Sequence, residues 1–196
     1  MTSTEPPPYT FDLAEEMIEA LAEEFDPERT VQELRGQVEG KSGDDWDAVA
    51  GEFFADYGRR LMERTIVLGD QYPDRTYEVM LATEERTGND GWPFKAQRVM
   101  EIALLGSQPI YTLPIVENGA YNFTWKLAFC ETYRQLEEQL GSEAASRLPC
   151  QAGCIAATKR AFSEYGFDVD VTAEGRMPDD EFCQFAAPRP AGGAQR

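Results

Sequence analysis

The chain has 196 residues, of which 42% are hydrophobic and 11% aromatic, which is enough apolar material for one folded domain. Its 36 acidic residues outnumber its 18 basic residues, so the formal net charge is −18. A field of this sign repels phosphate backbones and anionic membrane surfaces, and we therefore expect no binding to nucleic acid or membranes. The chain has no histidine, which excludes a Ser-His-Asp triad, a Cys-His dyad and a His-ligated metal.

The location of the protein follows from its apolar patterning. No apolar run in the sequence approaches the ~20 residues that span a bilayer, and the first eight residues lack the charged and apolar regions of a signal peptide. We expect a cytoplasmic protein, in which cysteines are thiols, ligands or catalysts rather than disulfides. Residues 1–10 and 188–196 are rich in proline or in small polar residues and are expected to be disordered, which leaves 11–187 as a single domain.

The first half of this domain, residues 11–105, is predicted to be helical. The first helix carries an apolar residue at every fourth position: Leu13, Met17, Leu21 and Phe25. A short helix over 28–38 follows, and a longer one begins at Asp44 or Asp45. The longer helix has an i, i+3, i+4 apolar stripe: Trp46, Val49, Ala50, Phe53, Tyr57 and Leu61. Further helices are predicted over 75–85 and 94–104, with a turn at 88–91 between them.

The second half, residues 106–187, is predicted to form a small antiparallel sheet with two helices. The segment 110–116 is at most an edge strand, because Pro114 interrupts it. The clearest strand is 121–129, where alternate residues are apolar and should share one face: Tyr121, Phe123, Trp125, Leu127 and Phe129. Helices over 131–140 and 150–165 are followed by strands over 167–173 and 182–186. The sequence therefore predicts an α+β fold, with a helical N-terminal half packed on a small antiparallel sheet and two further helices.

The four cysteines lie at junctions of these predicted elements. Cys130 ends the clearest strand, Cys150 opens the second helix, Cys154 lies one helical turn further on, and Cys183 lies in the last strand. Short connections bring such junctions to one edge of a sheet, so we expect Cys130, Cys150 and Cys154 around one pocket, with Cys183 near its floor. A helix N-terminus lowers the pKa of a thiol, which would make Cys130 or Cys150 nucleophilic.

Two other interpretations of the cysteines stay open. They could be small buried hydrophobic residues, and Cys183, between two aromatic residues, fits this best. All four could also ligate one metal ion. Consecutive cysteines are 20, 4 and 29 positions apart, which does not match the two C-x-x-C pairs of a zinc knuckle site. We therefore expect no metal ion and no other cofactor.

Several motifs of the second half resemble the L-2-amino-thiazoline-4-carboxylic acid hydrolase-like family. They are the segment Asn122–Cys130, then Tyr133, Leu140-Gly141, Leu148-Pro149-Cys150 and the closing segment Pro178–Phe185. The resemblance covers roughly residues 118–187 and implies hydrolytic opening of a cyclic amidine. This chain departs from the family after the second cysteine, where an acidic residue is frequent, and in the turn before the last strand, which lacks a glycine. The late Cys-x-Phe strand is also similar to vinyl-reductase-type small-molecule-binding domains.

The leading functional prediction is a cysteine-dependent hydrolase acting on a C–N bond of a small heterocycle. Cys130 or Cys150 would attack the amidine carbon, and a carboxylate, a tyrosine or a second thiol such as Cys154 would move the proton. The alternatives are a non-catalytic small-molecule-binding or sensory domain and a cysteine-ligated metal-binding protein.

Five further residues are candidates for the wall of the substrate pocket. Lys126 and Arg98 could bind a substrate carboxylate, and Trp125, Tyr133 and Cys183 could line the pocket. A surface position is the competing interpretation of Lys126, and a core position that of Trp125.

Overall fold

The structure is a computed structural model that describes residues 15–72, 75–88, 111–112, 115–118, 122–164 and 166–188. Its helices are α1 (Glu15–Glu24), α2 (Pro27–Val38), α3 (Gly43–Gln71), α4 (Arg75–Thr87), α6 (Glu131–Leu140), α7 (Ser142–Arg147) and α8 (Gln151–Ser163). Its strands are β1 (Tyr111–Thr112), β2 (Ile115–Asn118), β3 (Asn122–Leu127), β4 (Phe129–Cys130), β5 (Thr172–Gly175) and β6 (Cys183–Pro188). The predicted helix over 94–104, the predicted disordered segment 1–10 and residues 189–196 of the predicted disordered tail 188–196 lie outside the described residues. The first residue of that tail, Pro188, is instead the last residue of β6. None of the described helices is long and apolar enough to cross a membrane.

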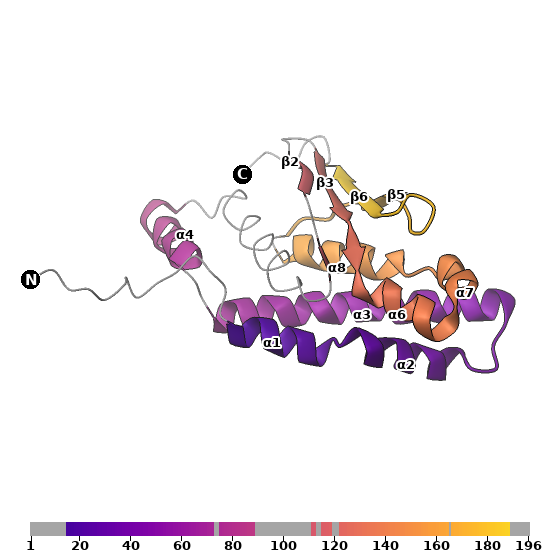
Figure 1. The fold of residues 1–196 in the computed structure, drawn as a ribbon. Coiled ribbons are helices and arrows are strands. Elements are labelled where there is room, and N and C mark those ends of the chain that lie inside the picture. The colour runs from indigo at the N-terminus through magenta and orange to yellow at the C-terminus, as the bar shows by residue number, and fades with distance from the viewer. Residues whose placement is uncertain are drawn as a thin grey trace, which may run out of the picture.

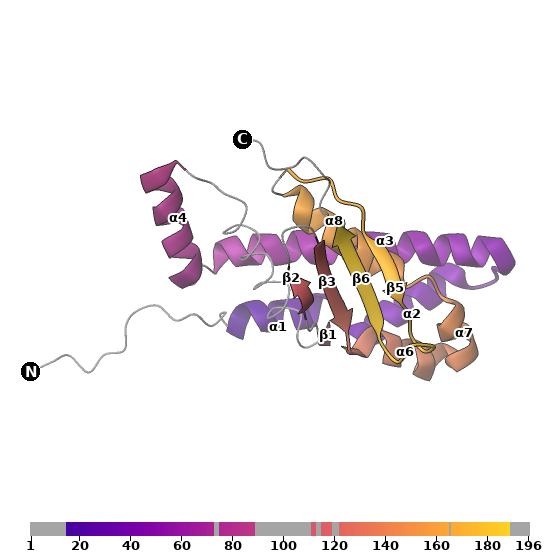
Figure 2. The ribbon, with the colours of Figure 1, turned by 90° about the horizontal axis from the view of Figure 1, so that it is seen from above.

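The elements are stacked in layers, as expected for the predicted α+β fold. A four-stranded sheet has the order β2-β3-β6-β5, and each neighbouring pair is antiparallel. The sheet covers α8, α8 packs on α3, and α1 and α2 lie along α3 on the side away from the sheet (Figure 1). Seen from above, the strands cross over α8 and α3, and α4 stands apart beyond the end of α3 (Figure 2). The predicted fold class is therefore confirmed.

Local capping signals set several helix boundaries. The Asp26 side chain accepts a hydrogen bond of 2.8 Å from the Arg29 N–H and caps α2. The helix predicted over 131–140 is present with these limits, and Gly141, with φ of 85°, follows its last residue. The longest helix, α3, begins at Gly43 rather than at an aspartate cap. Asp44 and Asp45 lie in its first turn, where the positive end of the helix dipole stabilises them.

The strand predicted over 121–129 is divided in two. β3 ends at Leu127, the chain bends at Ala128, and β4 pairs with β1 instead of continuing in the four-stranded sheet. Phe129, which was expected on the same face as Trp125, is therefore 45% exposed. β2 is an edge strand of the four-stranded sheet, as the segment 110–116 predicts.

The strand predicted over 167–173 is wrong in its position. The strand is β5, Thr172–Gly175, and residues 167–171 are not paired in the sheet. Val169 and Val171 are nevertheless buried beneath the sheet. The alternating apolar pattern here reflects the burial of every second side chain in an extended segment, which needs no hydrogen-bonded neighbour.

Three hydrophobic clusters hold the layers together. One joins α1 to α3, one joins α3 to α2, α6 and α7, and one lies between the sheet and α8. The predicted stripe on α3 is confirmed, since Ala50, Phe53, Tyr57 and Leu61 are buried. In this way α3 lies between α1 and α2 on one side and the cysteine-bearing half of the chain on the other.

Candidate functional site

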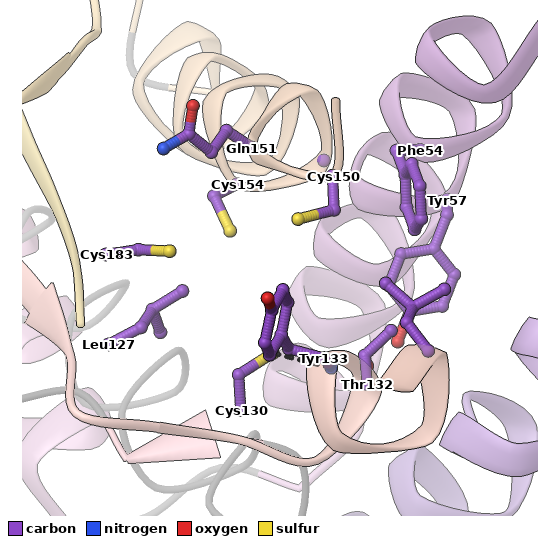
Figure 3. Close-up of a pocket in the computed structure, with 12 residues that line it drawn as sticks. Phe54, Tyr57, Leu127, Cys130, Thr132, Tyr133, Cys150, Gln151, Cys154 and Cys183 are labelled. Carbon is purple, nitrogen blue, oxygen red and sulfur yellow. Dashed lines mark hydrogen bonds between the residues drawn. The ribbon is translucent and has the colours of Figure 1, made fainter. Parts of the chain in front are cut away.

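The four cysteines surround one cavity between α3, α6, α8 and the sheet. Its walls are formed by Phe54, Tyr57, Leu127, Cys130, Thr132, Tyr133, Leu136, Cys150, Gln151, Gly153, Cys154 and Cys183. Figure 3 shows the side chains of Cys150, Cys154 and Cys183 directed toward a common space, with Cys130 on the α6 side. The cysteines are therefore brought together as their places at the strand and helix ends predict.

Each cysteine is positioned by the helix or strand in which it lies or which it precedes. Cys130 belongs to β4 and is also the N-cap of α6, where its Sγ accepts a hydrogen bond of 3.4 Å from the Tyr133 N–H. Cys150 is the N-cap residue of α8, and its side chain makes no capping bond. Cys154 follows one turn later on α8, and Cys183 lies opposite Leu127 in the β3–β6 ladder. All four are free thiols.

The cavity is small, and the described residues around it bring no charge. About 30 Å³ of it can be occupied by the centre of a water-sized sphere, which is more than the roughly 10–15 Å³ that one water molecule needs. No acidic or basic side chain is among the described residues that line it. Thr132 and Tyr133 are buried, and their hydroxyl groups have no hydrogen-bond partner among the described residues. The space thus suits a compact molecule of a few non-hydrogen atoms.

Burial controls the ionisation of the cysteines. It raises the pKa of Cys130 and of Cys150 from 9.0 to about 12, and it raises the pKa values of Cys154 and Cys183 as well. Neighbouring thiols add to the effect, because a second thiolate in the same space would repel the first.

The expectation that a helix N-terminus lowers the pKa of Cys130 or Cys150 is therefore wrong. Both residues do lie at helix N-termini, and backbone N–H groups do stabilise their thiolates. Loss of hydration outweighs this stabilisation, because the sulfur atoms point into the interior (Figure 3). At neutral pH all four thiols are protonated.

Arg176 is a basic residue near the cavity that the sequence analysis did not single out. Its positive charge lowers the pKa values of Cys150, Cys183 and Tyr133, against the larger effect of burial. Its guanidinium group donates a hydrogen bond to the Ser146 carbonyl, and its backbone N–H donates to Asp180 at 2.8 Å. Nothing in the local sequence distinguishes Arg176, because its approach to the cysteines depends on the packing of the segment before β6.

The predicted pocket residues are only partly brought together. Tyr133 and Cys183 line the cavity with the three predicted catalytic cysteines, whereas Trp125 and Lys126 do not. Trp125 is buried beneath the sheet and stacks on Phe123 and Phe185. The Lys126 Nζ lies 3.7 Å from the centre of the Phe182 ring. Arg98 lies outside the described residues.

Gly153 on α8 allows this helix to bring Cys150 and Cys154 close to α3. An added Cβ on Gly153 would lie 2.9 Å from the Phe54 carbonyl oxygen, which is closer than real Cβ atoms approach. Gly153 lies between Cys150 and Cys154, and Phe54 and Tyr57 form the facing wall of the cavity. The aromatic wall and the thiol wall are thus held together by direct contact of two helix backbones.

Among the residues that the structure describes, no group of three or more cysteine, aspartate or glutamate side chains is placed to hold a metal ion.

Comparisons with known proteins give little guidance. No family model and no curated protein matches the sequence. Among solved structures, the chain is similar to the crystal structure of a mutant H-NOX protein from K. algicida in its Fe(II) unliganded form. The TM-score is 0.40 and the identity 13%, over 91% of this chain and 95% of that chain. A similarity at this level supports no conclusion about the function of the chain.

Proposed function

We propose that the protein is a small-molecule-binding domain whose ligand occupies the cysteine-lined cavity. The observation that carries this proposal is the convergence of four thiols and three aromatic side chains, from α3, α6, α8, β4 and β6, on one small space. Ligand sites are typically concave, mostly apolar and provided with a few polar groups that fix orientation. This cavity has that composition, and its polar groups are the Gln151 amide and the Thr132 and Tyr133 hydroxyls.

The ionisation of the thiols favours binding over catalysis. A cysteine nucleophile reacts as the thiolate, and burial holds the pKa values of Cys130 and Cys150 at about 12. Protonated thiols are instead small, polarisable and weakly polar, and they suit a wall that contacts an uncharged ligand.

One observation favours a cysteine-dependent hydrolase as the second candidate. The Cys130 Sγ already accepts a backbone N–H at the start of α6, and the same helix N-terminus could stabilise negative charge in a transition state. Cys130 would add to the carbon of a cyclic amidine while its proton passes to an amidine nitrogen. The ring C–N bond would then break, and water would release the thiol. This route requires that the bound substrate lower the pKa of Cys130.

The two candidates are separated by binding and turnover measurements on the same variants. A library of uncharged fragments would be tested by ligand-observed NMR against the full chain and against Cys154→Met, whose longer side chain fills the cavity. Lys159→Met, an exposed change on the same helix, is the control. We expect fragments that bind the wild type and Lys159→Met but not Cys154→Met. Equal binding to all three proteins would contradict a ligand site in the cavity.

Turnover tests the second candidate. The 2-amino-thiazoline-4-carboxylic acid substrate would be incubated with the wild type and with Cys130→Ala. If the binding domain is correct, neither protein consumes the substrate. Consumption by the wild type that Cys130→Ala abolishes would establish the hydrolase instead.

A further inference from the structure

We infer that the ligand of this cavity is a compact, uncharged molecule with a carbonyl or amide oxygen that accepts a hydrogen bond from the Tyr133 hydroxyl. The inference rests on the proposed function and deepens it. It names the chemical class of the ligand and the residue that selects for it.

The Tyr133 hydroxyl is a buried group for which the described part of the chain provides no hydrogen-bond partner. Tyr133 is 6% exposed, and its Oη makes no hydrogen bond among the described residues. A hydroxyl that leaves water without gaining a partner costs free energy, so such groups in folded proteins are usually satisfied by a water molecule or a ligand. The adjacent Thr132 is 5% exposed, and its hydroxyl also finds no partner within the described ranges. Two neighbouring residues of α6 thus offer polar groups that no described part of the chain uses.

The Tyr133 hydroxyl is directed into the cavity. Figure 3 shows the phenol ring rising from α6, with its oxygen turned toward the side of the cavity formed by Cys150, Cys154 and Cys183. The Tyr133 ring is held by packing, because it is buried in the hydrophobic cluster that joins α3 to α2, α6 and α7. Its hydroxyl therefore faces whatever occupies the space beside the thiols.

The groups around this hydroxyl select an uncharged acceptor. Thiols are weak hydrogen-bond donors and acceptors. The Gln151 amide also lines the cavity, but it already donates to the Gly175 carbonyl at 3.1 Å and hydrogen-bonds Cys183. The tyrosine hydroxyl, for which the described residues provide no partner, is therefore a strong donor that stays available beside the sulfur atoms. None of the described residues that line the cavity is charged, and an ion placed beside them would lose its hydration without a counter-charge from them. The guanidinium of Arg176 does not line the cavity and already donates to the Ser146 carbonyl. The polarisable thiol wall complements the apolar remainder of the ligand.

Three small probes of nearly equal shape test the inference. Acetamide is uncharged and has a carbonyl oxygen, acetate carries a charge, and 2-methylpropene has no polar atom. Binding of each would be measured by NMR chemical-shift changes in the full-length wild type, in Tyr133→Phe and in Tyr72→Phe. Tyr72 packs on the cluster between α1 and α3 and does not line the cavity, so it is the matched control.

We expect acetamide to bind the wild type and Tyr72→Phe with equal affinity and acetate to bind at least tenfold more weakly. Tyr133→Phe should lose at least tenfold in acetamide affinity and keep its affinity for 2-methylpropene. Equal affinity of acetamide for Tyr133→Phe and the wild type would overturn the inference. So would tighter binding of acetate than of acetamide.

The measurement separates this inference from the proposed function. Binding of 2-methylpropene but not of acetamide to the wild type would leave a ligand site in place and remove the role of Tyr133. If none of the three probes binds and Cys154→Met has no effect on any fragment, both proposals are wrong.

Discussion

Gly58 on α3 and Gly153 on α8 meet at a backbone contact that leaves no room for a side chain. A Cβ atom on Gly58 would lie 1.9 Å from the Gly153 carbonyl oxygen, and real Cβ atoms essentially never approach within 3.0 Å. Gly153 lines the cavity, and Cys150 and Cys154 flank it on the same helix. The contact therefore sets how deeply α8 places its thiols between α3 and the sheet.

A methyl group at this contact should be strongly destabilising. Gly58→Ala forces the two helix backbones apart, and overpacking of this kind costs about 3 kcal/mol or more in the free energy of unfolding. The control is Gly36→Ala on α2, where an added Cβ meets nothing within 4 Å, and which should stabilise by about 0.5–1 kcal/mol. Urea unfolding followed by circular dichroism measures both. Equal stability of Gly58→Ala and the wild type would mean that the helices do not touch here.

The raised pKa values predict how stability depends on pH. The folded protein holds the Cys130 proton up to a pKa of about 12, whereas the unfolded thiol has a pKa near 9.0. The stabilisation is fully present below pH 9 and is lost as pH rises toward 12. Between these values, the free energy of unfolding should fall by about 1.4 kcal/mol per pH unit for each such thiol. Urea titrations from pH 7 to 11 should show a plateau and then a decline that is shallower in Cys130→Ala. Identical slopes for the two proteins would contradict burial of this thiol.

Arg176 should be detectable through the reactivity of a single thiol. Its charge lowers the pKa of Cys150, and it is not among the main influences on Cys130. Arg176→Gln should therefore slow the alkylation of Cys150 by iodoacetamide about two- to fivefold relative to Cys130, because a fraction of a pKa unit is lost. Mass mapping at pH 9 gives the ratio of the two rates, which cancels any general loosening of the fold. An unchanged ratio would show that the Arg176 guanidinium is too far from Cys150 to affect the pKa of its thiol.

The wild-type thiols give a baseline for the same experiment. All four should react more slowly than free cysteine at pH 7 and react fully in urea, because burial keeps them protonated and covered. If any cysteine of the folded protein reacted faster than free cysteine, that result would support a reactive thiolate and the hydrolase candidate.

Lys126 should matter for stability and not for binding. Its ammonium group lies over the Phe182 ring, a contact worth about 0.5–1 kcal/mol at a partly exposed site. Lys126→Met should lower the free energy of unfolding by about that amount and leave acetamide affinity unchanged. Isothermal unfolding and the NMR titration test the two statements separately. A tenfold loss of acetamide affinity in Lys126→Met would instead show that Lys126 contributes to ligand binding.

The parts of this fold that could be predicted from the sequence depend on local signals. The i, i+3, i+4 stripe that includes Phe53 and Tyr57 defines α3 because a helix that packs on one side must repeat its apolar residues at that period. Gly141 ends α6 because it adopts a positive φ at low cost. The convergence of the cysteines was predictable for a related reason, since each lies at an element end whose neighbours are connected by short segments.

The remaining features depend on distant parts of the chain. The pKa of Cys150 is governed by what covers its sulfur, and a helix-end pattern carries no information about burial. Arg176 reaches Ser146 across 30 positions of sequence. Val169 and Val171 alternate with exposed residues as strand residues do, yet which segment hydrogen-bonds to β6 is decided by the sheet and not by the alternation.

The length of α3 gives the Gly58–Gly153 contact a mechanical consequence. The helix has 29 residues, and at ~1.5 Å per residue it is a rod roughly 44 Å long. Gly58 lies near its middle, next to the aromatic residues that form one wall of the cavity. A small tilt of α3 about this pivot would move its two ends in opposite directions, and each end would travel further than the atoms beside the thiols. If a molecule of a few atoms bound between Tyr133 and the cysteines tilted α3, the helix would transmit its binding to the protein surface at both ends.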